Sequence, residues 1–209
     1  MMSLRNKEAL QNYVVTFIAE IDNFVEQLEL KSIEEAKDLI LDAERSKNRV
    51  HVTGIGKPGH VAGYVASLFS STGTPTYELH GTEAVHGSAG QVLPGDVVIA
   101  ISNSGETNEL KATVETLRRN GAKIIAVSGN ADSWLANISD VSLFAGVHAE
   151  GDVLDKAPRV SILAEMIILQ ALSIALQTEK GLTKEQYVKW HPGGSLGQGI
   201  KEELKQVVS

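Results

Sequence analysis

The chain has 209 residues, 43% of them hydrophobic and 22% charged, which are ordinary values for a globular protein with one sizeable domain. Its net charge of −7 argues against a nucleic-acid-binding surface but is compatible with a local pocket for an anionic substrate. There is no cysteine, which excludes disulfides and thiolate catalysis and fits a reducing, cytoplasmic compartment. Residues 1–20 lack a signal-peptide pattern, and the apolar region 162–176 is interrupted by Glu165 and Gln170. We expect that region to be a buried helix too short to span a bilayer, and we expect no membrane partner.

The first 46 residues predict two helices. Apolar residues between 4 and 29 recur at helical spacing, so we expect one long amphipathic helix within an N-terminal extension, 1–31. With no second core to cover its apolar stripe, this helix predicts a contact between subunits of a homo-oligomer. Ser32 and Glu35 have the spacing of a capping box, so we expect a second helix from Ser32 to about Ser46.

From residue 49 onward, strand-like runs alternate with helical patterns. We expect strands at 49–53, 76–79, 97–101, 123–128 and 141–144, and helices at about 58–71, 106–120, 132–138, 159–178 and 183–190. This alternation predicts an α/β fold, a three-layer αβα sandwich around a five-stranded parallel sheet, with the flavodoxin-like strand order 2-1-3-4-5. No linker divides the chain, so we expect a single domain, 1–209, that ends in a polar tail, 198–209.

The segment from Ser102 to Thr107 carries the strongest chemical signal. It connects a buried strand to a helix, and Ser102, Asn103, Ser104 and Thr107 supply short polar side chains around Gly105. Free N–H groups at such a helix start bind anions, and phosphate is the usual ligand. A polar turn whose hydroxyls only cap the helix is the alternative interpretation.

A second glycine-rich loop follows the first strand, with glycines at 54, 56 and 59. In the predicted strand order, both loops lie at the switch point, where ligands bind in such sheets. The spacing Gly-x-Gly-x-x-Gly is that of a nicotinamide dinucleotide loop, but Lys57 and Pro58 interrupt it, and the match by itself is weak. We interpret Lys57 as a cation directed into the crevice, with a solvated lysine as the alternative.

Histidines and carboxylates occupy three further loops. His80 and His86 flank Glu83 after the second strand, where they could ligate a metal, contact a substrate or bond to the backbone. Glu150 follows the fifth strand and therefore lies on the carboxyl-end side of the sheet. His191 precedes a proline and two glycines, which either stop a helix or deliver this histidine on a stiff turn into a neighbouring subunit.

Taken in order, these stretches resemble the sugar isomerase (SIS) family, most closely its arabinose-5-phosphate isomerases. The resemblance covers about residues 33–200 and rests on 54–60, 71–75, 80–87, 100–106 and 191–197. It implies a homotetramer that interconverts D-ribulose 5-phosphate and D-arabinose 5-phosphate without a metal or other cofactor. The residues that it implies are catalytic Lys57, Glu109, Glu150, His191 and His86, and phosphate-binding Ser102, Ser104 and Thr107, with Asn103 beside them.

The chain also departs from the family pattern. Pro58 replaces a serine that contacts phosphate, and Ser88 replaces an aspartate. Arg159 is a new cation near the crevice that could replace the lost phosphate donor, and Gly56 and His80 are further candidate substrate contacts. A pair of CBS modules, present in many members, is not found in these 209 residues.

These residues predict an isomerisation through an enediol(ate). Glu109 or Glu150 would move the proton between two carbons, Lys57 would stabilise the oxyanion, and His191 or His86 would assist ring opening. The alternatives are an isomerase of another sugar phosphate, such as 3-hexulose 6-phosphate, and a phosphosugar sensor without turnover. The complete catalytic set favours an enzyme, because sensing needs only the phosphate site.

Overall fold

Five parallel strands form the centre of the molecule, in the order β2-β1-β3-β4-β5. They are β1 (Val50–Gly54), β2 (Thr76–Glu78), β3 (Val97–Ile101), β4 (Lys123–Ser128) and β5 (Val141–Phe144). Every residue of β1 and β3 is buried, as expected for central strands of a parallel sheet that is covered on both faces. This computed structural model, which describes residues 4–207, confirms the predicted α/β class and strand order.

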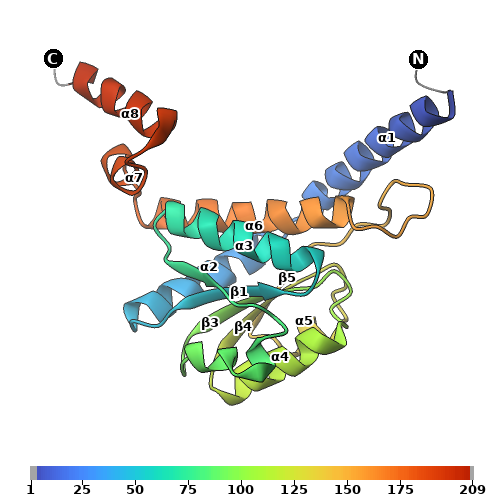
Figure 1. Ribbon diagram of the computed structural model, residues 1–209, viewed down its shortest axis with the longest axis horizontal. Coiled ribbons are helices and arrows are strands. Elements are labelled where there is room, and N and C mark those ends of the chain that lie inside the picture. Colours follow the sequence, from blue (N-terminus) through green and yellow to red (C-terminus); the bar gives the residue numbers. More distant parts are fainter. Residues whose placement is uncertain (1–3, 208–209) are drawn as a thin grey trace.

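Helices cover both faces of the sheet (Figure 1). On one face lie α2 (Leu30–Arg45) and α3 (Lys57–Ser71), and α6 (Val160–Glu179) packs against both of them. On the other face lie α4 (Asn108–Arg119) and α5 (Trp134–Ile138). Each side has its own apolar cluster, the larger one between the sheet and α2, α3 and α6. The predicted three-layer sandwich is therefore confirmed.

The most apolar helix is α6. By length and composition it could cross a membrane, and it is the one helix in residues 4–207 of which this is true. The expectation that this segment is too short to span a bilayer was wrong, because it counted only the apolar run 162–176 and not the whole helix of 20 residues. Half of its most apolar window is buried inside the protein, where Ile168, Leu169 and Leu172 belong to the larger core cluster. The prediction of a buried helix is confirmed for this face of α6.

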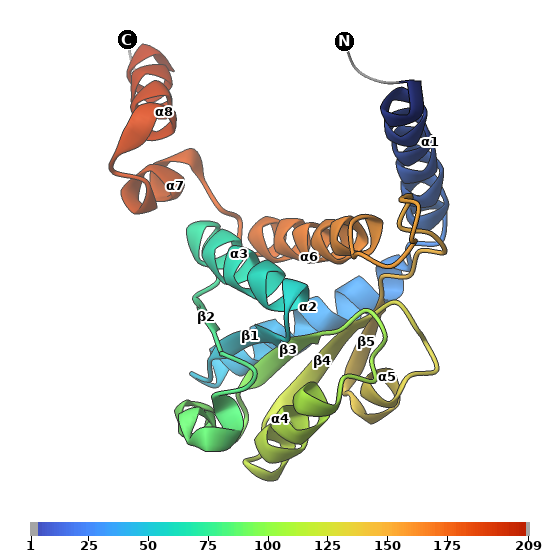
Figure 2. The ribbon, with the colours of Figure 1, turned by 45° about the vertical axis from the view of Figure 1, so that its right-hand side comes forward.

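Two helical extensions project from the same side of the body, at opposite ends of α6 (Figures 1 and 2). One is α1 (Leu4–Glu26), in which only Phe24 is buried. Leu10, Val14 and Ile18 of α1 are exposed apolar side chains, as the predicted stripe requires. The other extension is formed by α7 (Lys184–Trp190) and α8 (Gly194–Val207).

The expected start of the second helix was wrong. Ser32 does not cap α2: the helix begins at Leu30, and the Ser32 hydroxyl donates to the Glu29 carbonyl at 2.8 Å. The expected polar tail, 198–209, is helical as far as 207, in α8. The glycines at 194, 197 and 199 obscured apolar residues at 196, 200, 204 and 207, which recur at helical spacing. Residues 1–3 and 208–209 of the expected domain lie outside the described residues.

Lys180 joins three elements at the far end of α6. Its Nζ donates to Glu44 Oε1 at 2.7 Å, to the Gly73 carbonyl at 3.0 Å and to Thr74 Oγ1 at 2.7 Å. The side chain therefore ties the end of α6 to α2 and to the turn that follows α3. These three acceptors would lose their donor if the ammonium group were removed.

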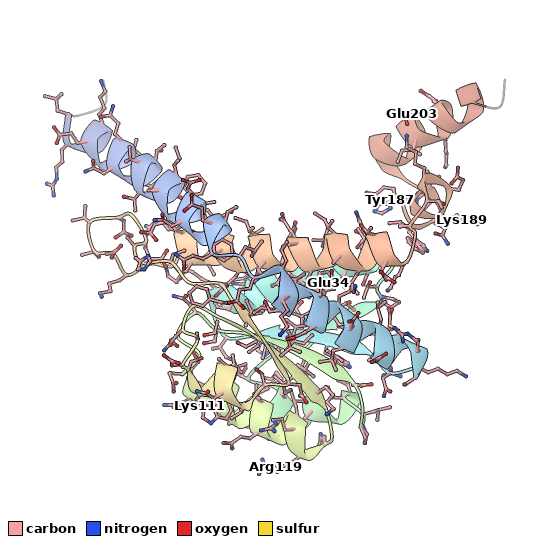
Figure 3. The ribbon with its side chains drawn as sticks, turned by 180° about the vertical axis from the view of Figure 1, so that it is seen from behind. Glu34, Lys111, Arg119, Tyr187, Lys189 and Glu203 are labelled. Carbon is pink, nitrogen blue, oxygen red and sulfur yellow. The ribbon has the colours of Figure 1, made fainter. Side chains whose placement is uncertain are left out.

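We expect Lys180→Met to lower the free energy of unfolding by about 2 kcal/mol, because partly buried acceptors are left unsatisfied. Urea denaturation measures this change. The matched control is Lys184→Met, which removes a 2.7 Å ion pair with Glu203 on the projecting C-terminal extension (Figure 3). Both of those side chains are exposed, so the control should lose less than about 0.5 kcal/mol. Equal losses in the two variants would contradict the role of Lys180.

Candidate active site

The register of the sheet brings the two glycine-containing loops together. Gly54, the last residue of β1, pairs with Ile101, the last residue of β3. The loops that begin at Ile55 and Ser102 therefore leave the same edge of the sheet from neighbouring strands. Because β2 flanks β1 on the other side, this is the switch point of the sheet, where ligands bind in such folds.

Hydroxyl groups hold the Ser102–Thr107 loop in its conformation. The buried Ser102 Oγ lies 3.1 Å from Thr107 Oγ1 and accepts the N–H of Gly105 at 3.1 Å. Thr107 is the N-cap residue of α4, but its side chain makes no capping hydrogen bond. The interpretation of these hydroxyls as simple helix caps therefore does not describe Thr107, whose hydroxyl faces the loop.

Gly105 allows this loop to pack closely. Its φ of 65° is in the left-handed region, and a Cβ at this position would overlap the side chain of Ser133. Asn103 and Ser104 are exposed at the turn. The loop thus presents two exposed polar residues over a buried, hydrogen-bonded base, which is an arrangement suited to an anion.

The two carboxylates that follow this loop have different environments. Glu106 accepts the backbone N–H of Trp134 at 2.7 Å and a hydrogen bond from Lys111 (Figure 3). The Lys111 bond, and after it the Trp134 bond, hold the pKa of Glu106 below its usual range. Glu106 therefore anchors α5. Glu109 is exposed in the first turn of α4, and none of its described contacts is a hydrogen bond to the protein. Of these two carboxylates, Glu109 is therefore the one available to act on a substrate.

Lys57 is the first residue of α3 and is exposed at the switch point. The preceding Gly56 has a φ of 66°, and Pro58 occupies the first helical turn, where its missing N–H costs nothing. A Cβ at Gly54 would lie 2.7 Å from the carbonyl carbon of Pro58, so this tight strand-to-helix turn requires glycine there. A pocket of about 280 Å³ joins Lys57 to Pro158 and Ile162, at the start of α6.

Glu150 is buried at the N-terminus of α6. Its Oε2 accepts the backbone N–H groups of Arg159 at 2.6 Å, Val160 at 2.7 Å and Ser161 at 3.2 Å. The helix dipole favours a negative charge at this position. No hydrogen bond within the described chain involves the other oxygen, Oε1. Since Arg159 directly follows a residue of the Lys57 pocket, Glu150 and Lys57 belong to the same corner of the molecule.

Arg159 lies to one side of this corner. Its guanidinium forms an ion pair with Asp152 and also donates to the Ala157 carbonyl at 3.3 Å. With Tyr13 and Leu10 of α1, it lines a separate pocket of about 530 Å³. The structure therefore places Arg159 toward α1 and gives it no described contact with the Ser102–Thr107 loop.

The two histidines that follow β2 lie in different places. His80 and Gly56 line a pocket of about 170 Å³, and the Nδ1 atom of His80 lies 3.0 Å from Thr82 Oγ1. His86 is exposed at the end of η1 (Ala84–His86), a short 3-10 helix followed by a second one, η2 (Ser88–Gln91). Within residues 4–207, no group of three His, Cys, Asp or Glu side chains is arranged to hold a metal ion.

His191 is far from this corner within its own chain. It follows α7, beyond the C-terminal end of α6, whereas Glu150 lies at the N-terminal end. The 20 residues of α6 make these ends about 30 Å apart. The ring of His191 stacks on Tyr187 at 3.9 Å, and its Nδ1 lies 2.9 Å from the Tyr187 carbonyl oxygen. The structure thus places Lys57 at the same sheet edge as the hydroxyl loop and close to Glu150 at the start of α6, but not His191.

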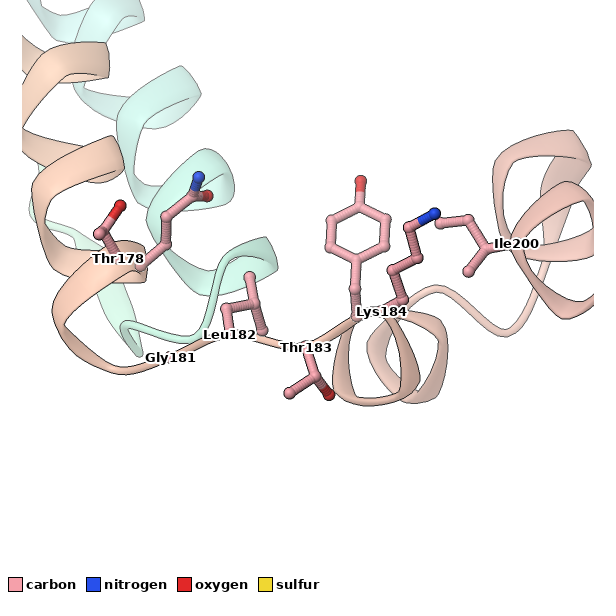
Figure 4. A pocket seen from close by; sticks show the side chains of 8 residues that line it. Thr178, Gly181, Leu182, Thr183, Lys184 and Ile200 are labelled. Atoms are coloured by element: carbon pink, nitrogen blue, oxygen red, sulfur yellow. The ribbon is translucent and has the colours of Figure 1, made fainter. Parts of the chain in front are cut away.

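A pocket of about 350 Å³ separates the end of α6 from α7 and α8 (Figure 4). Thr178 lines it on α6, Lys184 on α7 and Ile200 on α8. His191 is not among its lining residues. The C-terminal extension is thus separated from the end of α6 by this pocket, while Trp190 of α7 lies beside Gly73 in the turn after α3.

Glu165 is a candidate that sequence reasoning missed. It interrupts the apolar run of α6, yet its side chain is fully buried, and neither carboxyl oxygen has a hydrogen-bond partner in the described part of the chain. Burial, and to a smaller extent the charge of Glu150, raise the pKa of Glu165 to about 8. The available signal was a lone carboxylate four residues after Ser161 on a helix with few polar residues.

Comparison with known proteins identifies the family. The chain matches the SIS domain over residues 45–175. It is 39% identical over 194 residues to the arabinose 5-phosphate isomerase KdsD of Escherichia coli (strain K12), an alignment that covers 91% of this chain and 56% of the relative. The corresponding protein of Francisella tularensis is 35% identical over 210 residues, covering 99% of this chain and 64% of the relative. The chain thus spans between half and two thirds of the length of these curated relatives.

A solved structure extends the comparison. It is described as E. coli CFT073 c3406 in complex with arabinose 5-phosphate, and it superposes with a TM-score of 0.80 at 33% sequence identity. The superposition covers 92% of this chain and 100% of that chain. Since the domain match also spans more than half of the sequence, the chain belongs to the SIS domain family.

Proposed function

We propose that this protein is an aldose–ketose isomerase of sugar phosphates that interconverts D-ribulose 5-phosphate and D-arabinose 5-phosphate. The observation that carries the proposal is that Lys57 and the Ser102–Thr107 loop leave the same sheet edge, with the buried Glu150 beside the Lys57 pocket. Similarity to the KdsD enzymes, and to a structure in complex with arabinose 5-phosphate, supports this pair of substrates. An isomerisation moves hydrogen within one molecule, so it needs an acid–base group, an oxyanion partner and a site for the phosphate.

The geometry suggests a role for each group. The substrate phosphate binds at the Ser102–Thr107 loop, where Asn103 and Ser104 are exposed. A carboxylate removes a proton from C1 of the ketose and returns it to C2 of the enediol(ate), which gives the aldose. Glu150 suits this role because Oε2 is anchored and Oε1 is free, and Glu109 is the alternative base. The ammonium group of Lys57 stabilises the oxyanion, helped by its position at a helix N-terminus.

The proposal includes a homo-oligomer, with a tetramer favoured, in which a second copy supplies His191. Two observations support this: His191 lies beyond the far end of α6, and α1 exposes Leu10, Val14 and Ile18. His191, or alternatively the exposed His86, would then assist opening of the sugar ring. The proposed enzyme is cytoplasmic and has no nucleic-acid or membrane partner, which agrees with a net charge of −7 and no cysteine.

Hydrogen exchange with solvent tests the function directly. Metal-free protein is incubated with D-ribulose 5-phosphate in D2O, and NMR is expected to show arabinose 5-phosphate with deuterium at C2. Lys57→Met should lower the rate by at least about 100-fold, because it removes the oxyanion partner. Binding without exchange would instead indicate a sensor, and exchange only into 3-hexulose 6-phosphate would indicate the other isomerase. Failure to exchange with any pentose or hexose phosphate would overturn the proposal.

A further inference from the structure

Glu165 and Ser161 form a buried polar pair on the core-facing side of α6. They are one helical turn apart, so their side chains share a face of the helix. Both residues are fully buried, and the Ser161 hydroxyl and both Glu165 oxygens lack hydrogen-bond partners in the described residues. Buried polar groups without partners are costly, so a natural protein that keeps three such atoms in one place calls for an explanation.

This pair lies directly behind Glu150. The backbone N–H of Ser161 donates to Glu150 Oε2 at 3.2 Å, so the first turn of α6 connects the candidate base to the pair. Glu165 is also close enough for the charge of Glu150 to act on it. The negative charge of Glu150 therefore favours the protonated, neutral form of Glu165.

We propose that Glu165 is a positioning residue for the isomerisation. While Glu165 is an uncharged acid, Glu150 carries the only buried carboxylate charge at the start of α6. Ionisation of Glu165 adds a second one and sets the upper pH limit of activity. This inference rests on the proposed function. The enediolate intermediate is itself negative, and a second buried carboxylate charge beside Glu150 would oppose its formation. The neutral state of Glu165 is thus the active one.

Other titratable groups do not replace Glu165 in this role. Three helices pack against α6. The buried or half-buried titratable side chains on α1 and α2 are Tyr13, Glu20, Lys37 and Glu44. The titratable side chains on α3, which are Lys57, His60 and Tyr64, are exposed. In the loop before α6, Glu150 is buried and Asp152 is half-buried. Of all these groups, only Glu150 shifts the pKa of Glu165, in addition to burial itself.

The test compares the pH profile of kcat/KM for the wild type and Glu165→Gln between pH 6 and pH 10. In the wild type, kcat/KM should fall about tenfold per pH unit above a pH of about 8. In Glu165→Gln this fall should move to higher pH, so that at pH 9 the variant retains about tenfold more of its own pH 7 activity than the wild type does. Coincident profiles would contradict the proposal.

Infrared titration provides a readout that does not depend on turnover. The carbonyl band of a buried, protonated carboxyl group should be present at pH 7 in the wild type, absent in Glu165→Gln, and lost as the pH passes about 8. Its midpoint should be lower in Glu150→Gln, because the charge that raises it has been removed. If no sugar phosphate is isomerised but the midpoint shifts in this way, the proposed isomerase function is wrong, while the effect of the Glu150 charge on Glu165 is confirmed. Absence of the band at pH 7 overturns the inference whatever the activity.

Ser173→Ala is the matched control. This buried serine lies two turns further along α6, where its hydroxyl is 3.1 Å from Thr72 Oγ1, on the side away from Glu150. The control should lose some stability without moving the alkaline fall of kcat/KM. An equal movement in Ser173→Ala would assign the effect to packing. If Glu165→Gln does not fold, Glu165→Met replaces it in the pH profiles. If neither variant folds, the infrared titration of the wild type decides.

Discussion

Two inactive variants, Lys57→Ala and His191→Ala, are expected to regain isomerase activity when they are combined in one oligomer. Within a chain, His191 lies beyond the end of α6 that is remote from Lys57 and Glu150. In the proposed oligomer, a complete site therefore combines the Lys57 of one copy with the His191 of another. Random mixing of equal amounts makes about a quarter of the sites complete, since each of the two contributing chains must be the right variant.

The measurement compares the isomerase activity of each variant alone with that of the mixed oligomers. Each variant alone should retain about 1% of wild-type activity or less, as is typical when an oxyanion-stabilising or acid–base group is removed. Co-refolded or co-expressed mixtures, purified through two different tags, should then rise to about a quarter. The control mixes Lys57→Ala chains with Glu150→Gln chains. Because one chain supplies both Lys57 and Glu150 to a site, every site in this mixture keeps one defect, and activity should not recover. Purified mixed oligomers of the first pair that stay inactive would show that His191 does not act between subunits.

Glu150→Gln is expected to lower kcat by about 10² to 10⁴, because an amide cannot take up the substrate proton. The amide oxygen can still accept the N–H groups of Arg159, Val160 and Ser161, so the start of α6 should keep its structure. Glu150→Ala removes that acceptor as well and should lower the free energy of unfolding by a further 1 kcal/mol or so. Steady-state kinetics and urea denaturation of the two variants separate catalysis from capping.

Glu109→Gln decides between the two candidate bases. If Glu109 moves the proton, its amide variant will show the large loss of kcat, and Glu150→Gln will keep more than about a tenth of the wild-type rate. Glu109 is exposed and makes no described hydrogen bond to the protein, so stability should not change in Glu109→Gln. A large effect on kcat would therefore be purely chemical for Glu109.

Local sequence signals predicted the sheet and the switch-point loops correctly. The runs at 97–101 and 124–127 are apolar because both faces of these strands are covered, and the polar residues after them mark the carboxyl edge. Helix ends were harder to predict, because the Ser32 hydroxyl bonds to the Glu29 carbonyl and does not cap α2, and because α8 contains glycines that are typical of loops. At Gly197, for example, a Cβ would overlap the His191 carbonyl oxygen, so glycine is needed for close packing and does not mark a loop.

Non-local contacts explain the rest. Glu106 and Glu109 resemble each other in sequence, and only the position of α5 shows that Glu106 is bound to the backbone of Trp134. The pattern also showed Glu165 as an interruption without revealing that it is buried behind Glu150. The separation of His191 from Lys57 depends on the whole length of α6, which no short motif contains.

The small amount of α1 that is buried has a consequence for how the protein responds to dilution. A helix of 23 residues with one buried side chain gains little from its own protomer, and isolated helices are marginal in water. In the proposed oligomer, ordering of α1 is therefore coupled to association by mass action. Below the dissociation constant of the assembly, helicity of α1 and completion of the site by His191 would be lost in the same step. Protomer concentration would then act as an on–off control of the enzyme, without any effector.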